Sequence, residues 1–267
     1  MNFNEENLNA ALSGKTIGSP LYFYKSVEST NSSALSLAKD GAPEGTAIVA
    51  DNQTHGRGRM QRVWQSPPAL NLYASLIMRP NLAAALSSPV TIMAGVAVAE
   101  VLSAYCPTQV QLKWPNDVLV NDKKICGILT EIKAIHNKIE FIIMGIGINI
   151  NMQKNDLSPS IEKIATSLRL EVGKSINRVE LTVKLFEKIA YFYQLFLKER
   201  IEPIRELWLS YSQLLGRCVE VTFGGEVYQG EVTAMDDAGA LIIKSESGVQ
   251  RRVIAGDVKI IKDIKCC

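Results

Sequence analysis

Three arginines stand close together in a glycine-rich stretch of the sequence, GRGRMQRVW at residues 56–64. Arginine presents a planar fork of donors that fits the oxygens of phosphate or carboxylate. The glycines allow backbone amides to approach the same anion, because no Cβ stands in the way. The stretch therefore predicts a mobile loop that closes over a phosphate group. A solvated loop or an RNA-contacting segment is the simpler alternative.

A lysine, an amide and a carboxylate gather at a second place, KWPND at residues 113–117. Pro115 fixes its own φ and forces the preceding residue to be extended, so the chain bends at Asn116 and Asp117. This turn would present an amide and a carboxylate beside Lys113. A plain turn between two strands is the simpler interpretation.

Two further segments place glycines within apolar strands, KKICGIL at 123–129 and GIGININ at 145–151. A glycine in a strand lets a ligand or another backbone lie against the sheet. The second segment lacks the third glycine and the following helix of a dinucleotide fingerprint, which excludes a Rossmann site. The lysines of the first segment are alternatively an edge-strand device against aggregation.

The elements that must position these motifs are both strands and helices. Aromatic, β-branched and alternating residues predict strands at 21–27, 46–51 and 71–78, and four more between 109 and 150. Capping residues and apolar spacing predict helices at 29–40, 87–105, 178–199 and 202–214. Residues 52–69 have no apolar period and are expected to form a loop.

The pattern changes near Gly216. From Cys218 to Lys262 the chain reads as five short alternating strands separated by turns that contain glycine or aspartate. This pattern is typical of a small SH3-like barrel. We therefore predict two domains, residues 1–215 and residues 216–267.

The composition limits the class of protein. The chain has 267 residues, 47% of them hydrophobic and 21% charged, with a net charge of +2. These values exclude a disordered chain and a protein that mainly coats nucleic acid. The most apolar stretch, 91–105, carries Glu100 and is too short to cross a bilayer, and the N-terminus has no signal-peptide pattern. We expect a cytoplasmic protein without a membrane partner.

The cysteines and histidines argue against a zinc site. The five cysteines show no CxxC spacing and there are only two histidines, whereas a carboxylate-bound magnesium is left open. Scattered cysteines in odd number fit a reducing compartment, and the terminal Cys266-Cys267 is expected to be a solvated tail.

Together, and in this order, the motifs resemble one family, the biotin protein ligases. The resemblance extends from about residue 20 to residue 262. Its elements are Ser29-Thr30-Asn31, Gln53 leading into GRGRMQRVW, KWPNDVLV from Lys113, KKICGILTE from Lys123, GIGININ from Gly145, ATSL at 165–168 and the small C-terminal domain.

The resemblance implies an α+β fold, with a mixed β-sheet catalytic domain backed by helices, as in class II aminoacyl-tRNA synthetases, and a small C-terminal SH3-like β-barrel. It implies ATP, Mg²⁺ and biotin. The biotin carboxylate attacks the α-phosphate of ATP, and a lysine of a biotin carboxyl carrier protein, such as an acetyl-CoA carboxylase subunit, then takes biotin from biotinyl-5′-AMP. Cations must offset the repulsion of two anions, and a closing loop must shield the anhydride.

The resemblance also implies roles for individual residues. Lys124 and Arg59 would offset charge at the biotin carboxylate and the α-phosphate, and Asp117 would accept the proton of the incoming lysine. The biotin-binding residues would be Ser29, Thr30, Asn31, Gln53, Gly56, Arg57, Lys124, Gly127, Leu129 and Gly147. The nucleotide-binding residues would be Arg59, Arg62, Trp64, which packs by the adenine, Asn116 and Asn149. The metal ligands are left open.

Two departures from the repressor-type members of the family bear on function. Met60-Gln61 replaces a basic residue and a glycine in the loop, which concerns loop dynamics. Only about 20 residues precede the first predicted strand, so we expect a monofunctional ligase without sequence-specific DNA binding. A homodimer is left open. The alternatives are a lipoate or octanoyl ligase of the same fold, a non-catalytic biotin-sensing regulator, and an RNA-binding module, which would lack stacking aromatics.

Overall fold

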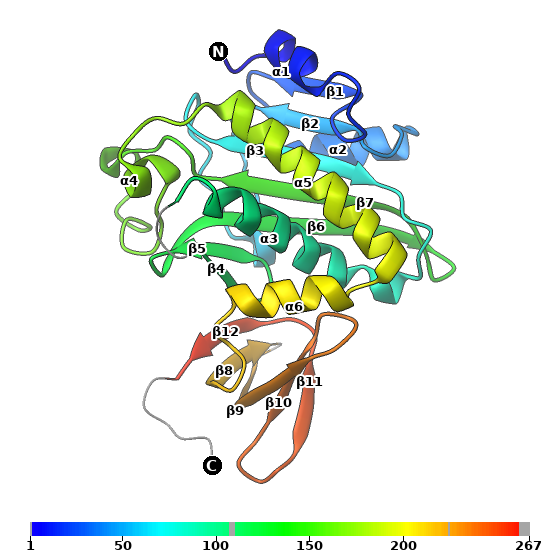
Figure 1. Ribbon diagram of the computed structural model, residues 1–267, viewed down its shortest axis with the longest axis vertical. Coiled ribbons are helices and arrows are strands. Elements are labelled where there is room, and N and C mark those ends of the chain that lie inside the picture. Colours follow the sequence, from blue (N-terminus) through cyan, green and yellow to red (C-terminus); the bar gives the residue numbers. More distant parts are fainter. Residues whose placement is uncertain (1, 107–109, 224, 262–267) are drawn as a thin grey trace.

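Two β-sheets organise the chain in the computed structural model, which describes residues 2–106, 110–223 and 225–261 (Figure 1). The large sheet has seven strands in the order β1-β2-β3-β7-β6-β5-β4, and the small sheet has five in the order β11-β10-β9-β8-β12. β1 and β2 pair in parallel, and the other neighbours of the large sheet pair antiparallel. The predicted fold class, a mixed sheet with helices followed by a C-terminal β domain, is confirmed.

The large sheet is built from strands joined partly by tight turns. Its strands are β1 (Leu21–Tyr24), β2 (Ala47–Ala50), β3 (Leu72–Met78), β4 (Val110–Lys113), β5 (Asp117–Val120), β6 (Lys123–Ile135) and β7 (Lys138–Ile148). Positive φ at both Asn121 and Asp122 and at both His136 and Asn137 gives the two-residue hairpin turns on either side of β6. These turns fix the register of β5, β6 and β7.

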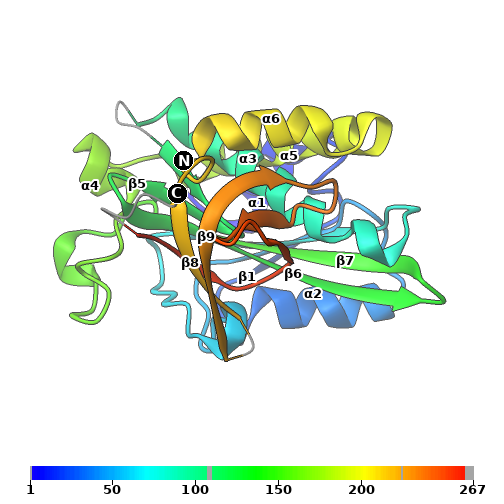
Figure 2. The same ribbon diagram turned by 90° about the horizontal axis from the view of Figure 1, so that it is seen from below.

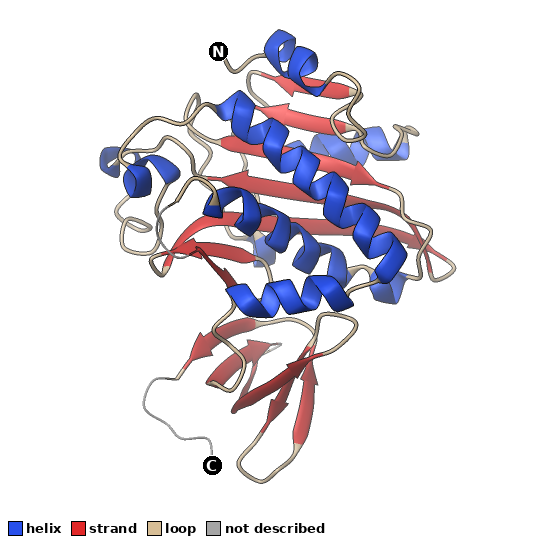
Figure 3. Cartoon of the chain, in the orientation of Figure 1, coloured by secondary structure: helices blue, strands red, loops and turns tan. Residues whose placement is uncertain are grey.

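Helices cover both faces of this sheet (Figures 2 and 3). α3 (Ser88–Ser103), α5 (Arg178–Glu199) and α6 (Glu202–Tyr211) pack on one face, and α2 (Thr30–Lys39) packs on the other. The predicted strands and helices are thus present with small differences: the first strand ends at Tyr24 and the last helix at Tyr211.

α3 is the most apolar helix of the fold. The segment Ala84–Ser103 is long and apolar enough to cross a membrane, so the expectation that the apolar stretch at 91–105 is too short to do so is wrong, but most of the segment is buried within the protein. It packs against β6 and against α5 and α6. Such burial is typical of the core helix of a globular domain. The predicted core helix at 87–105 is therefore confirmed.

Two short helices were not predicted. α1 (Glu5–Leu12) is capped by Asn4, whose Oδ1 accepts from the Asn7 amide at 3.0 Å, and it buries Leu8 and Leu12. α4 (Leu168–Val172) begins after Ser167 and ends at Gly173. Helices this short depend on tertiary packing, since one or two turns are not stable alone. The local sequence therefore carries only a weak signal for them.

The small sheet packs against the end of the large domain (Figure 1). Its strands are β8 (Cys218–Phe223), β9 (Glu226–Met235), β10 (Leu241–Lys244), β11 (Gln250–Val253) and β12 (Asp257–Ile260). The turn between β9 and β10 makes the contact: the indole of Trp114 donates to the Gly239 carbonyl at 2.9 Å, and Arg205 pairs with Asp237 at 2.7 Å. The predicted boundary near residue 215 stays a prediction.

The cysteines differ in part from expectation. Cys106 and Cys126 are free and buried, and burial raises the pKa of the Cys126 thiol. Cys218 is disulfide-bonded, and the reducing compartment stays a prediction. Pairing requires two thiols to meet in space, which spacing along the sequence does not show. Cys266 and Cys267 lie outside the described residues.

Candidate active site

A cavity of about 490 Å³ lies over the face of the large sheet that α2 covers. Its walls come from the start of α2, the loop after β2, strands β5, β6 and β7, and Asp257 of the small domain. It brings together nearly all the predicted site residues: Ser29, Thr30, Asn31, Gln53, Arg57, Arg59, Arg62, Trp64, Asn116, Asp117, Lys124, Gly127, Leu129, Gly147 and Asn149. Gly56 lies in an adjoining cavity of about 510 Å³ between the arginine loop and β6.

The floor of the cavity is a patch of sheet that is rich in glycine. The register places Gly127 opposite Gly147 and Leu129 opposite Gly145. These residues share one face because side chains alternate along a strand, while Ile128 and Ile146 face the core. A Cβ at Gly147 would stand 2.6 Å from the Trp64 ring, and one at Gly145 would stand 2.0 Å from Asn31 Oδ1. The glycines of GIGININ are therefore required by close approach, as their position in a strand predicted.

One end of the cavity is lined by uncharged polar groups in a hydrogen-bonded network. Gln53 Oε1 accepts from the Thr30 amide at 2.9 Å, and Gln53 Nε2 donates to Ser66 Oγ at 2.9 Å. The fully buried Ser75 lies with its hydroxyl 2.8 Å from Thr30 Oγ1 and 2.6 Å from Asn31 Oδ1. Ser75 is not among the site residues predicted from the sequence. The sequence feature that could have identified it is a hydroxyl within an otherwise apolar strand, because a buried polar group needs a hydrogen-bond partner.

Asn31 uses most of its hydrogen-bonding groups in bonds to other residues of the protein. Its Nδ2 donates to the Leu129 carbonyl at 3.2 Å and to Glu131 Oε2 at 2.8 Å, and its Oδ1 faces Ser75. An amide has two N–H donors, and both are used here. Binding of biotin by Asn31 stays a prediction; in this geometry the residue anchors α2 to β6.

The other end of the cavity is cationic. Lys124 Nζ lies 2.7 Å from Asp117 Oδ1 and 5.4 Å from the centre of the Trp64 ring. Arg59 donates to Asn116 Oδ1 at 3.0 Å, and Asn116 donates to the Ile128 carbonyl at 2.9 Å. Burial lowers the pKa of Arg59 from its ordinary value, against the carboxylates of Asp257 and Asp117, which raise it. Two cations thus converge where an anionic group would be stabilised.

Trp64 has an unused donor. Its Nε1 is buried and has no hydrogen-bond partner within residues 2–106, 110–223 and 225–261. An unpaired buried donor is costly, so a ligand acceptor at this place would be favoured. The indole rests over Gly127 and Gly147. Its packing by an adenine ring stays a prediction.

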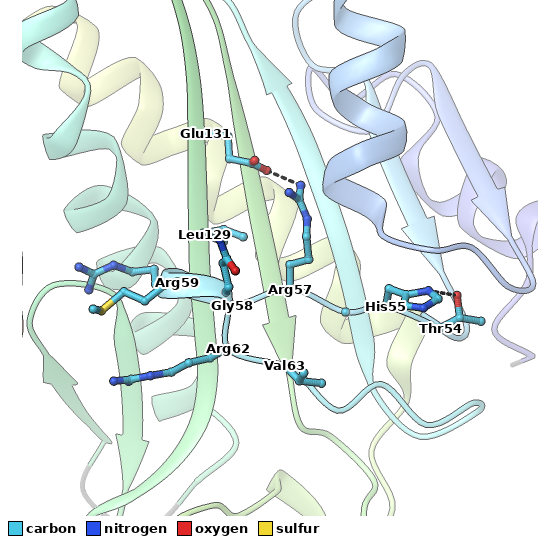
Figure 4. A pocket seen from close by; sticks show the side chains of 12 residues that line it. Thr54, His55, Arg57, Gly58, Arg59, Arg62, Val63, Leu129 and Glu131 are labelled. Atoms are coloured by element: carbon cyan, nitrogen blue, oxygen red, sulfur yellow. Dashed lines mark hydrogen bonds and ion pairs between the residues drawn. The ribbon is translucent and has the colours of Figure 1, made fainter.

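The arginine loop has more structure than expected. Residues Arg59–Gln61 form a short 3₁₀ turn, with positive φ at Met60 and Gln61. Figure 4 shows Arg57 pointing toward Glu131, while Arg59 and Arg62 extend to the other side of the loop. Each arginine finds an acceptor on another element: Glu131 for Arg57, Asn116 for Arg59 and Asp257 for Arg62. Composition alone did not show these partners, because all three are distant in the sequence.

Asn149 lines the cavity and is held by bonds to the protein itself. Its side-chain Nδ2 donates to the Thr166 carbonyl at 3.0 Å, and its backbone N–H donates to the Ile125 carbonyl at 2.9 Å. These bonds tie the end of β7 to the ATSL segment. A nucleotide-binding role for Asn149 stays a prediction.

The described part of the chain contains no group of three histidine, cysteine or carboxylate side chains that could hold a metal ion. Within the cavity, Asp117 and Asp257 already pair with Lys124 and Arg62. These residues therefore do not fit a metal cage made by the protein alone.

Known proteins share both domains of this chain. The profile of the Biotin/lipoate A/B protein ligase family matches residues 23–149, and that of the biotin protein ligase C-terminal domain matches residues 214–260. The bifunctional ligase/repressor BirA of Bacillus subtilis is 34% identical, over 96% of this chain and 79% of that protein. The biotin–[acetyl-CoA-carboxylase] ligase of Paracoccus denitrificans is 31% identical, over 84% of this chain and 93% of that protein.

A solved structure has the same fold. The biotin protein ligase of Aquifex aeolicus in complex with biotin and ATP superposes with a TM-score of 0.76, covering 90% of this chain and 98% of the other at 29% identity. The matches extend over both the catalytic and the C-terminal part of the chain. The chain therefore belongs to the biotin protein ligase family.

Proposed function

We propose that this biotin protein ligase makes biotinyl-5′-AMP and transfers biotin to a carrier lysine with the residues of the 490 Å³ cavity. The observation that carries this proposal is the polarity of the cavity. Uncharged hydroxyl and amide groups line one end, and Lys124 and Arg59 converge at the other. Biotin has the same polarity, with a neutral ureido ring at one end and a carboxylate at the other. No such observation favours lipoate, which has no ureido group for the polar end to recognise.

In the first step, an oxygen of the biotin carboxylate attacks the α-phosphorus of ATP, and the bond to the bridging oxygen breaks to release pyrophosphate. Two anions must meet for this bond to form. We propose that Lys124 holds the carboxylate and that Arg59 stabilises the charge that develops on the α-phosphate. Ser29, Thr30 and Gln53 orient the ureido ring, so that the carboxylate lies at the cationic end.

In the second step, the neutral amine of a carrier lysine attacks the acyl carbon of biotinyl-5′-AMP, and the bond to the phosphate oxygen breaks to release AMP. The amine must lose a proton as the amide forms. We propose that Asp117, whose Oδ1 lies 2.7 Å from Lys124 Nζ, accepts this proton. The partner would be a biotin carboxyl carrier protein, and the location of the reaction in the cytoplasm stays a prediction.

Magnesium enters this proposal only as part of the ATP substrate. Mg²⁺ is commonly bound through substrate phosphates with few protein ligands. The described residues offer no three-ligand cage. No step above depends on the ion.

Biotinylation of a carrier tests the proposed function. The protein is incubated with MgATP, biotin and an apo carrier domain, and the product is detected with streptavidin. Parallel reactions contain lipoate in place of biotin, or a carrier whose target lysine is replaced by arginine. We expect a signal in the complete reaction alone. Transfer of lipoate at a comparable rate would contradict the proposal.

Asp257 provides a prediction for the small domain. It lines the cavity, pairs with Arg62 and stands near Arg59, so its charge opposes the binding of phosphates. Exposed ion pairs of this kind are weak, about 0–1 kcal/mol. We expect Asp257→Asn to lower the KM for MgATP by about two- to fivefold and to leave biotin affinity unchanged.

The matched control is Asp237→Asn. Asp237 is also an exposed carboxylate of the small domain, lies outside the cavity and pairs with Arg205 of α6. Steady-state kinetics at fixed biotin measure both variants. A raised KM for ATP in Asp257→Asn would show that the ion pair assists nucleotide binding instead.

We expect no sequence-specific DNA binding by this chain. A net charge of +2 provides little attraction for the phosphate backbone, and none of the motifs is a DNA-reading element. A gel shift with operator-like and random duplexes, with and without biotin and ATP, measures this. A salt-resistant, sequence-selective shift at nanomolar protein would contradict it. Light scattering of the same samples shows whether the protein forms a homodimer.

A further inference from the structure

Glu131 joins the arginine loop to the polar end of the cavity. It lies on β6, and one of its oxygens, Oε2, accepts from Arg57 Nη2 at 2.8 Å (Figure 4). The same oxygen accepts from Asn31 Nδ2 at 2.8 Å. We propose that Glu131 is a positioning residue that holds this loop closed over the bound intermediate. The inference rests on the proposed function, because it assumes that biotinyl-5′-AMP occupies the cavity.

The loop has little else to hold it at this side. Met60 and Val63 are 69% and 82% exposed, so apolar burial contributes little to its position. The Arg62–Asp257 pair is exposed on both side chains, whereas the Glu131 side chain is 30% exposed. A pair that is better shielded from water is screened less. Arg57–Glu131 is therefore the stronger of the two ion pairs that fasten the loop.

The second bond of Glu131 connects the loop to the ligand end. Asn31 fills the space over Gly145 and faces the Ser75 hydroxyl, which also contacts Thr30. The backbone amide and the hydroxyl of Thr30 both donate to Gln53 Oε1. The Glu131 carboxylate thus orders both Arg57 and the Asn31 amide, which lies behind the proposed ureido-binding groups. A ligand that orders Thr30 and Gln53 is expected to favour loop closure through the same network.

Neutralising Glu131 should loosen the loop without removing a group from the reacting centre. Lys124 and Arg59 bind Asp117 and Asn116, and neither contacts Glu131. We therefore expect Glu131→Gln to form biotinyl-5′-AMP in a single turnover within about twofold of the normal rate. We expect it to release the intermediate about fivefold faster, the upper end of what a partly exposed ion pair contributes.

Glu140→Gln is the matched control. Glu140 is on the neighbouring strand β7, is 34% exposed on its side chain and pairs with Lys133 at 2.8 Å, but lies outside both cavities. The full-length proteins are compared for adenylate formed, adenylate released without carrier, and amide exchange across residues 54–63. Arg57→Ala breaks the same pair from the loop side. Because Arg57 is also a predicted biotin-binding residue, this variant is compared for amide exchange without ligand and not for adenylate formation, and that comparison tests the pair if Glu131→Gln does not fold.

The expected result is a split between formation and release, with faster exchange in the loop of Glu131→Gln and of Arg57→Ala but not of Glu140→Gln. The Glu131→Gln/Arg57→Ala double variant should show loop exchange no faster than Glu131→Gln alone, because that change already removes the charge to which Arg57 is paired. The inference would be overturned if Glu131→Gln lost adenylate formation and adenylate retention to the same extent. It would also be overturned if the variant matched the normal protein in both amide exchange and adenylate retention. Amide exchange is measured without ligand, so it tests how the loop is held even if the normal protein makes no adenylate. Failure of the normal protein to make adenylate would overturn the proposed function and not this inference.

Discussion

Replacing Lys124 by alanine is expected to slow the formation of biotinyl-5′-AMP by about 10- to 150-fold, the range for one lost charge-assisted hydrogen bond. Lys124 Nζ is one of the two cations at the end of the cavity where the carboxylate and the α-phosphate must meet. Without it, the repulsion between the two anions is offset by Arg59 alone. The change also leaves Asp117 without its ion-pair partner, which should lower the stability of the protein.

Pyrophosphate release in a single turnover measures this effect, and melting temperature measures the change in stability. The strand itself should persist, because the main chain of Lys124 keeps its bonds to Ile164 and Thr166. The matched control is Lys123→Ala, since Lys123 is exposed and lies outside the cavity. The Lys124→Ala/Asp117→Asn double variant removes the unpaired carboxylate. If it adenylates biotin at the normal rate, Lys124 does not serve the chemistry.

Replacing Gly145 by alanine is expected to weaken biotin binding by about 10- to 100-fold. The added Cβ would stand 2.0 Å from Asn31 Oδ1, so the amide must leave its place. Asn31 would then lose its bonds to Leu129, Glu131 and Ser75, in a region where unpaired polar groups cost about 1–3 kcal/mol each. The disturbance reaches Thr30 and Gln53 through the Ser75 hydroxyl.

Calorimetric titration with biotin measures this loss, and a double variant identifies its cause. In Gly145→Ala/Asn31→Ala the colliding amide is absent, so the pair of changes should bind biotin no worse than Asn31→Ala alone. The control is Gly95→Ala in α3, where the new Cβ would meet its nearest neighbour at 3.5 Å, an ordinary contact. Additive losses in the double variant would show that the collision is not the cause.

The glycines at the floor of the cavity show which features of the site could be predicted from the sequence. The spacing of Gly145 and Gly147 within an apolar strand, and of Gly127 within another, predicted close approach of a ligand or a strand. The structure adds that Gly127 and Gly147 are direct neighbours across two strands and that Trp64 lies on them. Alternation along each strand is local and readable, whereas the pairing register depends on the turn at His136 and Asn137.

The arginine loop shows the opposite case. Its composition predicted an anion-binding segment, but not that its arginines would have partners in the absence of a ligand. Those partners, Glu131, Asn116 and Asp257, are between 57 and 195 positions away in the sequence. No local pattern marks a carboxylate as the acceptor for a distant guanidinium.

The sequence by itself determined most of the helices and strands, because periodicity and turns are properties of neighbouring residues. The fold class and the set of residues that gathers at one cavity followed from the resemblance of its ordered motifs to the biotin protein ligase family. Only the tertiary structure decided which of these residues use their hydrogen bonds within the protein, as Asn31 and Asn149 do, and which have a donor without a partner among the described residues, as Trp64 does. It also brought in Ser75, Glu131 and Asp257. Hydrogen bonding and ion pairing depend on distances of about 3 Å between groups, and those distances exist only once strands and helices remote in the chain have packed together.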